Sequence, residues 1–133
     1  MHHISHLYCR LCEFEVPWGE PAIIYIENQQ SQRIEWGLPS EHSHLHVLPR
    51  NGYKYGVLSR CLCMDCLMET KLDLDESWMI PWHWDRPQKT ISELDERKCR
   101  ICSSHNILTY AELTRAACPV CREGILVKEE RII

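Results

Sequence analysis

The chain has 133 residues, the size of one ordinary domain or of two very small ones. Charged residues make up 26% of it and aromatic residues 8%, with a single Phe, so a large continuous apolar core is difficult to assemble and small modules need other staples. The net charge of -4 disfavours a generic attraction to nucleic-acid phosphates.

Neither a secretory leader nor a membrane span is expected. Residues 1–6 lack both a basic and an apolar region. No stretch approaches the roughly 18 apolar residues that cross a bilayer. We therefore expect a cytoplasmic protein in a reducing compartment, with no membrane association.

Two β-hairpins are predicted in the first half of the chain. Residues 21–26 and 33–36 are β-rich runs on either side of a polar turn at residues 28–31. Residues 42–48 and 53–58 flank a second turn that contains Asn-Gly, a strong hairpin signal.

Helical spacing is weaker and shorter. Apolar positions between Cys66 and Leu72 predict a short helix that begins near residues 64–65. Residues 93–97 and 110–117 could each form a turn or two of helix. The terminal histidines His2, His3 and His6 are expected in a mobile terminus.

Cysteines are the main chemical signal of the sequence. Eight of the nine fit two four-thiolate sites, and the two-residue spacing in a reducing compartment indicates metal rather than disulfides. The nine are Cys9, Cys12, Cys61, Cys63, Cys66, Cys99, Cys102, Cys118 and Cys121. Zinc prefers such tetrahedral sulfur ligands, so two zinc ions are expected.

The C-terminal site is predicted from Cys99-Arg-Ile-Cys102 and Cys118-Pro-Val-Cys121, fifteen residues apart. Residues 118–127 resemble the second knuckle of a zinc ribbon, in which a glycine such as Gly124 lets the chain turn into a strand. This resemblance covers residues 97–130. It implies a structural site, because four thiolates leave no open coordination position.

The first site is predicted from Cys9 and Cys12 together with Cys63 and Cys66, which leaves Cys61 as a spare. A pairing of Cys61 with Cys66 stays open. A knuckle, strands and then a ligand pair on the first turn of a helix resemble a treble clef, whose helix N-terminus would favour thiolates.

Residues 44–52 followed by Cys63-Met-Asp-Cys66 resemble HNH nucleases, which would make His46 the general base and His44 a candidate metal ligand. The chain departs from that family where Leu67 follows Cys66, a place at which His or Asn is usual. His42, His44 and His46 alternate on one strand face, where they could bind zinc or face solvent.

The fold class we expect is small metal-bound α+β, mostly antiparallel β, in two zinc-ribbon or treble-clef-like modules. The modules are residues 1–76 and 93–133, joined by a Trp- and Pro-rich linker at 77–92. The linker tryptophans could form shared core or an exposed anchor for a partner. They are Trp78, Trp82 and Trp84.

Three functions are carried forward. The first is a non-catalytic zinc-binding adaptor or accessory subunit that acts through a protein partner, using the acidic first module and the linker. The second is a nucleic-acid-binding zinc ribbon, and the third an HNH-like endonuclease. The second would use Arg97, Lys98, Arg100, Arg115 and Arg122. Metal removal is expected to unfold both modules.

Overall fold

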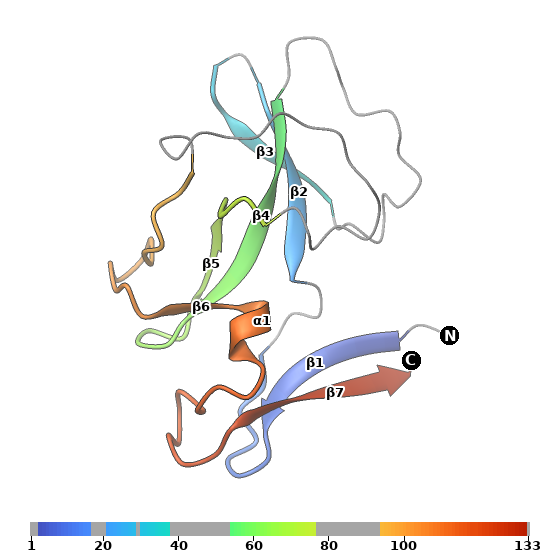
Figure 1. Cartoon of the computed structure of the whole chain (residues 1–133), viewed down its shortest axis with the longest axis vertical. Coiled ribbons are helices and arrows are strands. Elements are labelled where there is room, and N and C mark those ends of the chain that lie inside the picture. Colours follow the sequence, from blue (N-terminus) through green and yellow to red (C-terminus); the bar gives the residue numbers. More distant parts are fainter. Residues whose placement is uncertain (1–2, 17–20, 29, 38–53, 77–93, 133) are drawn as a thin grey trace. The chain divides into compact units, whose positions relative to one another are not determined.

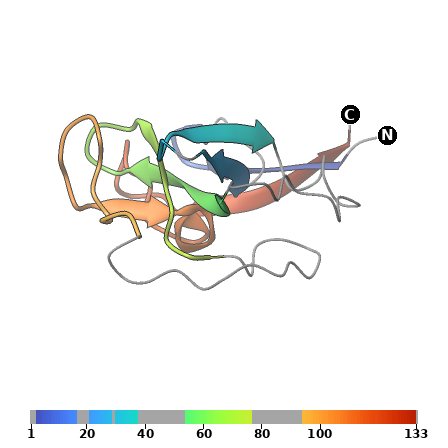
Figure 2. The ribbon, with the colours of Figure 1, turned by 90° about the horizontal axis from the view of Figure 1, so that it is seen from above.

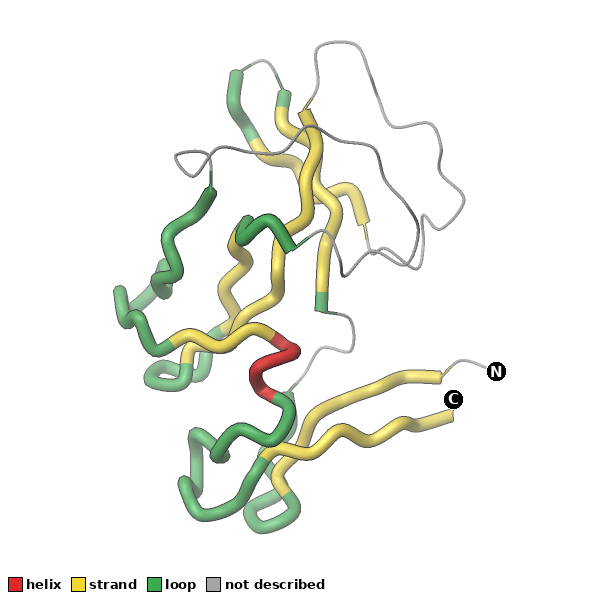
Figure 3. Tube along the Cα trace, in the orientation of Figure 1, coloured by secondary structure: helices red, strands yellow, loops and turns green. Residues whose placement is uncertain are grey.

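The computed structural model describes residues 3–16, 21–28, 30–37, 54–76 and 94–132 (Figure 1). The described residues are mostly antiparallel β, as expected, but they contain almost no helix, whereas an α+β fold with several short helices was predicted (Figure 3). The elements in chain order are β1 (His3–Cys9), β2 (Ala22–Glu27), β3 (Arg33–Gly37), β4 (Lys54–Cys63), β5 (Glu69–Leu72), β6 (Ile107–Thr109), α1 (Tyr110–Leu113) and β7 (Leu126–Ile132).

The chain forms two compact units that interleave along the sequence. Unit one contains Met1–Pro21, Cys61–Thr70 and Lys98–Ile133. Unit two contains Ala22–Arg60 and Lys71–Arg97. These units do not coincide with the sequential modules 1–76 and 93–133, because the chain leaves unit one twice and returns to it twice.

Two antiparallel strand pairs organise unit one. Strands β1 and β7 pair along their whole length, with Cys9 opposite Leu126, and lie side by side in both views (Figures 1 and 2). The end of β4 pairs with β6, with Cys63 opposite Ile107. Each pair therefore joins a strand that precedes one Cys-x-x-Cys turn to a strand that follows another.

The core of unit one is small. Its fully buried aliphatic side chains come from β1, β4, α1 and β7 and pack with buried cysteines. They are Leu7, Leu62, Leu113 and Leu126, and Val16, which follows the first cysteine turn, is buried with them. A core with so few large side chains needs another stabilising element, and we expect the cysteine clusters to supply it.

Helix α1 is shorter than residues 110–117. It begins with a capping box in which Thr109 Oγ1 accepts from the Glu112 amide and Glu112 accepts from the Thr109 amide. It ends after Leu113 because the next residues are needed for β pairing: the Arg115 amide donates to the Leu126 carbonyl, and Ala117 bridges to Ile125.

Unit two contains the predicted first hairpin. β2 and β3 pair antiparallel around the turn, as the sequence indicated, and β2 also pairs with β4. One of its apolar clusters consists of Ile23, Tyr25 and Leu58. Of the second predicted hairpin, residues 54–58 lie in β4, and residues 42–48 lie outside the described residues.

The prediction of a helix after Cys66 is wrong. Leu67 has a φ of 65°, in the left-handed region that a right-handed helix cannot continue through, and β5 follows. Thr70 and Leu72 are buried while Glu69 and Lys71 are half-buried, the two-residue period of a strand.

Two further expectations need correction. The described part of the expected helix at residues 93–97 is not helical. His3 and His6 belong to β1 rather than to a mobile terminus, and the His6 side chain is buried. None of the helices among the described residues has the length and apolarity needed to cross a bilayer.

Candidate metal centres

Eight of the nine cysteines gather into two groups of four within unit one. In each group the four sulfur atoms lie within 4.8 Å of one another. The outer group is Cys9, Cys12, Cys118 and Cys121, and the inner group is Cys63, Cys66, Cys99 and Cys102. Each group could hold a metal ion.

The grouping differs from the one expected from the sequence. We predicted that Cys9 and Cys12 join Cys63 and Cys66, and that the last four cysteines form the other site. The four Cys-x-x-Cys turns lie, in chain order, at residues 9–12, 63–66, 99–102 and 118–121. The cysteines of the first turn group with those of the fourth, and the cysteines of the second turn group with those of the third. The strand pairs explain this nesting, because β1 lies beside β7 and β4 lies beside β6.

The two strand pairs that adjoin the cysteine groups have the same register relative to the cysteines. Cys9 stands opposite Leu126, five residues after the last cysteine of the outer group. Cys63 stands opposite Ile107, five residues after the last cysteine of the inner group. The protein therefore uses one strand–turn–turn–strand arrangement twice.

All four Cys-x-x-Cys turns share one backbone pattern. In each turn the carbonyl of the first cysteine accepts from the amide four residues later, at 2.9 to 3.0 Å. The residue that donates follows the second cysteine and has a φ between 60° and 66°. These residues are Glu13, Leu67, Ser103 and Arg122. The sharp reversal points both sulfur atoms of a turn to the same side.

The fourth turn is one residue longer than the others. The amide of Cys118 donates to the carbonyl of Gly124, six residues on, whereas Cys9, Cys63 and Cys99 donate to the carbonyl five residues on. A Cβ at Gly124 would lie 2.5 Å from the Cys9 sulfur. The glycine expected to aid a turn is therefore needed to make room for a ligand of the opposite strand.

The sulfur spacing fits a tetrahedral ion. A metal about 2.3 Å from each of four sulfurs at tetrahedral angles places the sulfurs about 3.8 Å apart. The Cys9–Cys121 and Cys12–Cys118 separations are 3.7 and 3.5 Å, and the Cys63–Cys102 and Cys66–Cys99 separations are 3.5 and 3.6 Å. A disulfide needs about 2.0 Å, so these cysteines are free thiols set at ligand distance.

Backbone amides surround the sulfur atoms and favour the thiolate form. Cys99 Sγ accepts from the amides of Ile101 and Cys102, at 3.4 and 3.5 Å. Cys118 Sγ accepts from the Val120 amide and Cys121 Sγ from the Gly124 amide. Donors of this kind stabilise negative charge on sulfur, which a metal ligand must carry.

The thiol pKa values in each group split apart. Amide hydrogen bonds from Cys102 and Ile101 lower the pKa of Cys99 to about 6, and those from Gly124 and Glu123 lower the pKa of Cys121 to about 7. For Cys12 the Phe14 amide acts in the same direction, but burial and three neighbouring thiols raise its pKa to about 12. Four thiolates this close repel one another unless a cation joins them.

The ninth cysteine is separate from both groups. Cys61 lies in β4, opposite Thr109 of β6, and its side chain is fully buried. Cys63 takes part in the inner group and Cys61 does not.

Several predicted residues lie outside the described part of the chain. These are His42, His44 and His46 and the linker tryptophans Trp78, Trp82 and Trp84. Among the described residues, the two cysteine groups are the only clusters of His, Cys, Asp or Glu with ligand spacing. Both are closed sets of four thiolates, which suit a structural ion better than a catalytic one.

Comparisons with known proteins add no relative: no family model, no curated protein and no solved structure matches the chain.

Proposed function

We propose that each cysteine group holds one zinc ion and that the protein is a non-catalytic adaptor for a protein partner. Four thiolates at tetrahedral spacing suit zinc, with iron as the main competitor. The repeated strand–turn–turn–strand arrangement supports two ribbon-type sites. A strand after Cys66, in place of a helix, speaks against a treble clef for the inner site.

The observation that carries the adaptor proposal is the exposure of aliphatic side chains at the turns. Leu11, Ile101 and Val120 occupy the same position in three of the four turns and are 62, 60 and 50% exposed. Two of these turns repeat Cys-Arg-aliphatic-Cys, one in each group. A polar side chain at an exposed turn would serve the fold equally well. Exposed aliphatic side chains at these positions are therefore suited to contact with another protein.

Charge favours a protein partner over nucleic acid. Unit one has seven Lys and Arg against nine Asp and Glu, a net charge of -2. Each zinc ion with four thiolates adds about -2 more. The exposed cations Arg100, Arg115 and Arg122 therefore lie in an acidic unit, which a polyanion would approach poorly.

Affinity capture from the native cell tests the adaptor proposal. The tagged full-length chain should retain one stoichiometric partner, and the double variant Leu11→Asp with Ile101→Asp should lose it while keeping two zinc ions. Ile34→Asp is the matched control, since Ile34 is 55% exposed but lies in β3 of unit two. Absence of a stoichiometric partner, or oligonucleotide binding that weakens steeply with salt, would contradict the proposal.

A further inference from the structure

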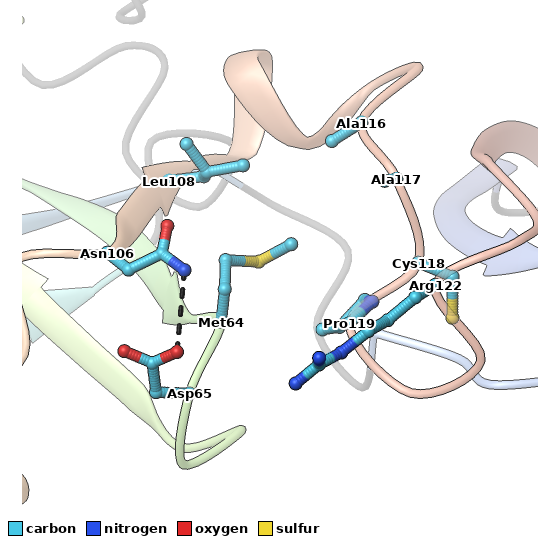
Figure 4. A pocket seen from close by; sticks show the side chains of 9 residues that line it. All are labelled: Met64, Asp65, Asn106, Leu108, Ala116, Ala117, Cys118, Pro119 and Arg122. Carbon is cyan, nitrogen blue, oxygen red and sulfur yellow. Dashed lines mark hydrogen bonds between the residues drawn. The ribbon is translucent and has the colours of Figure 1, made fainter.

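An open groove of about 470 Å³ lies in unit one beside both cysteine groups. Its lining comes from the second turn, from the residues around β6 and from the fourth turn, and includes Met64, Asp65, Asn106, Leu108, Pro119 and Arg122 (Figure 4). This volume falls in the range of ligand-binding clefts, roughly 300 to 1,000 Å³.

The wall beside the inner group presents hydrogen-bonding groups in a fixed arrangement. Asp65 accepts from the Ser104 hydroxyl and, at 3.5 Å, from the Asn106 side-chain amide. The Asn106 carbonyl accepts from the Met64 amide at 2.9 Å, which ties this residue to the turn. A carboxylate has about four acceptor positions, so Asp65 can still accept from a ligand.

The other wall presents a cation. Arg122 runs beside Pro119 and extends toward Met64 and Asp65 (Figure 4). Within the described part of the chain its guanidinium makes no hydrogen bond or ion pair. A guanidinium binds carboxylates through two parallel hydrogen bonds, so it can select a ligand by geometry as well as by charge.

The floor between these walls is apolar. Met64 and Leu108 are half-buried and Ala116 adds a small side chain, which leaves space for an aliphatic residue of a ligand. None of the described residues that line the groove is aromatic, so nothing there offers a stacking platform for a base.

We propose that this groove binds an extended segment of a protein partner through an internal Asp or Glu side chain that pairs with Arg122. The backbone amides of the segment would donate to Asp65, and an adjacent aliphatic side chain would contact Met64 and Leu108. This inference rests on the proposed adaptor function and assigns it a binding site.

Charge complementarity selects a carboxylate. Arg122 can balance one negative charge, whereas Asp65 and the two thiolate-bound ions make the surroundings acidic. A dianionic phosphate or a nucleic-acid backbone would bring more negative charge than one guanidinium offsets.

Short peptide libraries provide the direct test. The zinc-loaded full chain is presented with immobilised, acetylated and amidated peptides in which the central residue is fixed as Glu, Gln or Lys and the flanking residues are randomised. We expect selection from the Glu library, with an aliphatic residue near the Glu, and weaker binding to the Gln library.

Charge variants connect the selection to the groove. Arg122→Gln should weaken binding of selected Glu peptides about tenfold, and Arg122→Glu should shift preference to the Lys library. Arg115→Gln is the matched control, since Arg115 is exposed, lies outside the groove and shares the left-handed backbone, with φ of 71° against 60° for Arg122. Ala116→Trp, which would fill the floor, should also abolish binding while zinc content stays unchanged.

Three results would overturn the proposal: no preference for Glu, unchanged binding in Arg122→Gln, or binding only of peptides with a free C-terminal carboxylate. Its failure can be told apart from failure of the adaptor function. If a stoichiometric cellular partner is retained equally by the wild type and Arg122→Gln, the adaptor function stands and the groove assignment is wrong. If the libraries select peptides but no cellular partner is captured, the groove assignment stands and the adaptor function is wrong.

Discussion

The two units differ in what holds them together. Unit one places eight thiols in two tetrahedral groups around a small aliphatic core. In unit two, the described residues include no such group and instead join a hairpin to neighbouring segments by buried hydrogen bonds. The same chain thus has two candidate metal sites in one unit and a buried polar network in the other, and each unit should fail under a different perturbation.

The network of unit two centres on Asp73, whose side chain is fully buried. The Tyr25 hydroxyl donates a hydrogen bond to the Asp73 carboxyl group, and the Asp75 amide donates a second one to the same group. Arg33 pairs with Asp95 at 2.7 Å and lies over the Tyr25 ring, 5.0 Å from its centre. These contacts connect β2 and β3 to segments more than forty residues away in the sequence.

Metal removal should produce the largest difference between the units. Structural zinc can contribute about 10 kcal/mol or more to folding, so a strong chelator should unfold unit one. Hydrogen exchange on the full chain should show loss of amide protection in β1, β6 and β7 and retained protection in the β2–β3 hairpin. This refines the expectation that both predicted modules unfold.

The nested grouping of the cysteines gives the next largest effect. Cys9→Ser combined with Cys118→Ser removes two ligands from one group, so the double variant should still bind one metal ion. Cys9→Ser combined with Cys63→Ser damages both groups and should bind none, as measured by elemental analysis. If the sequential grouping were correct, the two results would be exchanged. Cys61→Ser, outside both groups, should keep two ions.

Two glycines allow a matched comparison between units. A Cβ at Gly124 would lie 2.5 Å from the Cys9 sulfur, and a Cβ at Gly56 would lie 2.6 Å from the Tyr25 hydroxyl oxygen. Each Ala variant should lose about 1 to 3 kcal/mol in free energy of unfolding. Only Gly124→Ala should also weaken metal affinity in a competition assay with a chromophoric chelator. Equal metal affinities would show that the Cys9 sulfur can move without cost.

The sequence predicted local features better than long-range ones. The Cys-x-x-Cys spacing identified the eight residues of the two groups, because two thiols on one tight turn are a local property. It could not show that Cys9 lies beside Cys121, since that depends on β1 pairing with β7 across more than a hundred residues. The helix predicted after Cys66 failed for a related reason: Leu67 takes a left-handed conformation imposed by the turn, and its side chain carries no signal of this.

An effect no larger than that of the glycine variants concerns the buried hydroxyl of unit two. Tyr25→Phe keeps the ring that Arg33 covers but removes one of the donors to Asp73, which stays buried. Removing one hydrogen-bond partner of a buried carboxyl group costs about 1 to 3 kcal/mol. Lys71→Gln is the control, since the largely solvent-accessible Lys71–Glu35 pair at 2.9 Å, in which Lys71 is half-buried and Glu35 exposed, should contribute less than about 1 kcal/mol. Urea unfolding should therefore rank Tyr25→Phe as the more damaging change, with two metal ions bound in both variants. A Tyr25→Phe protein as stable as Lys71→Gln would mean that this hydroxyl adds little to the stability of unit two.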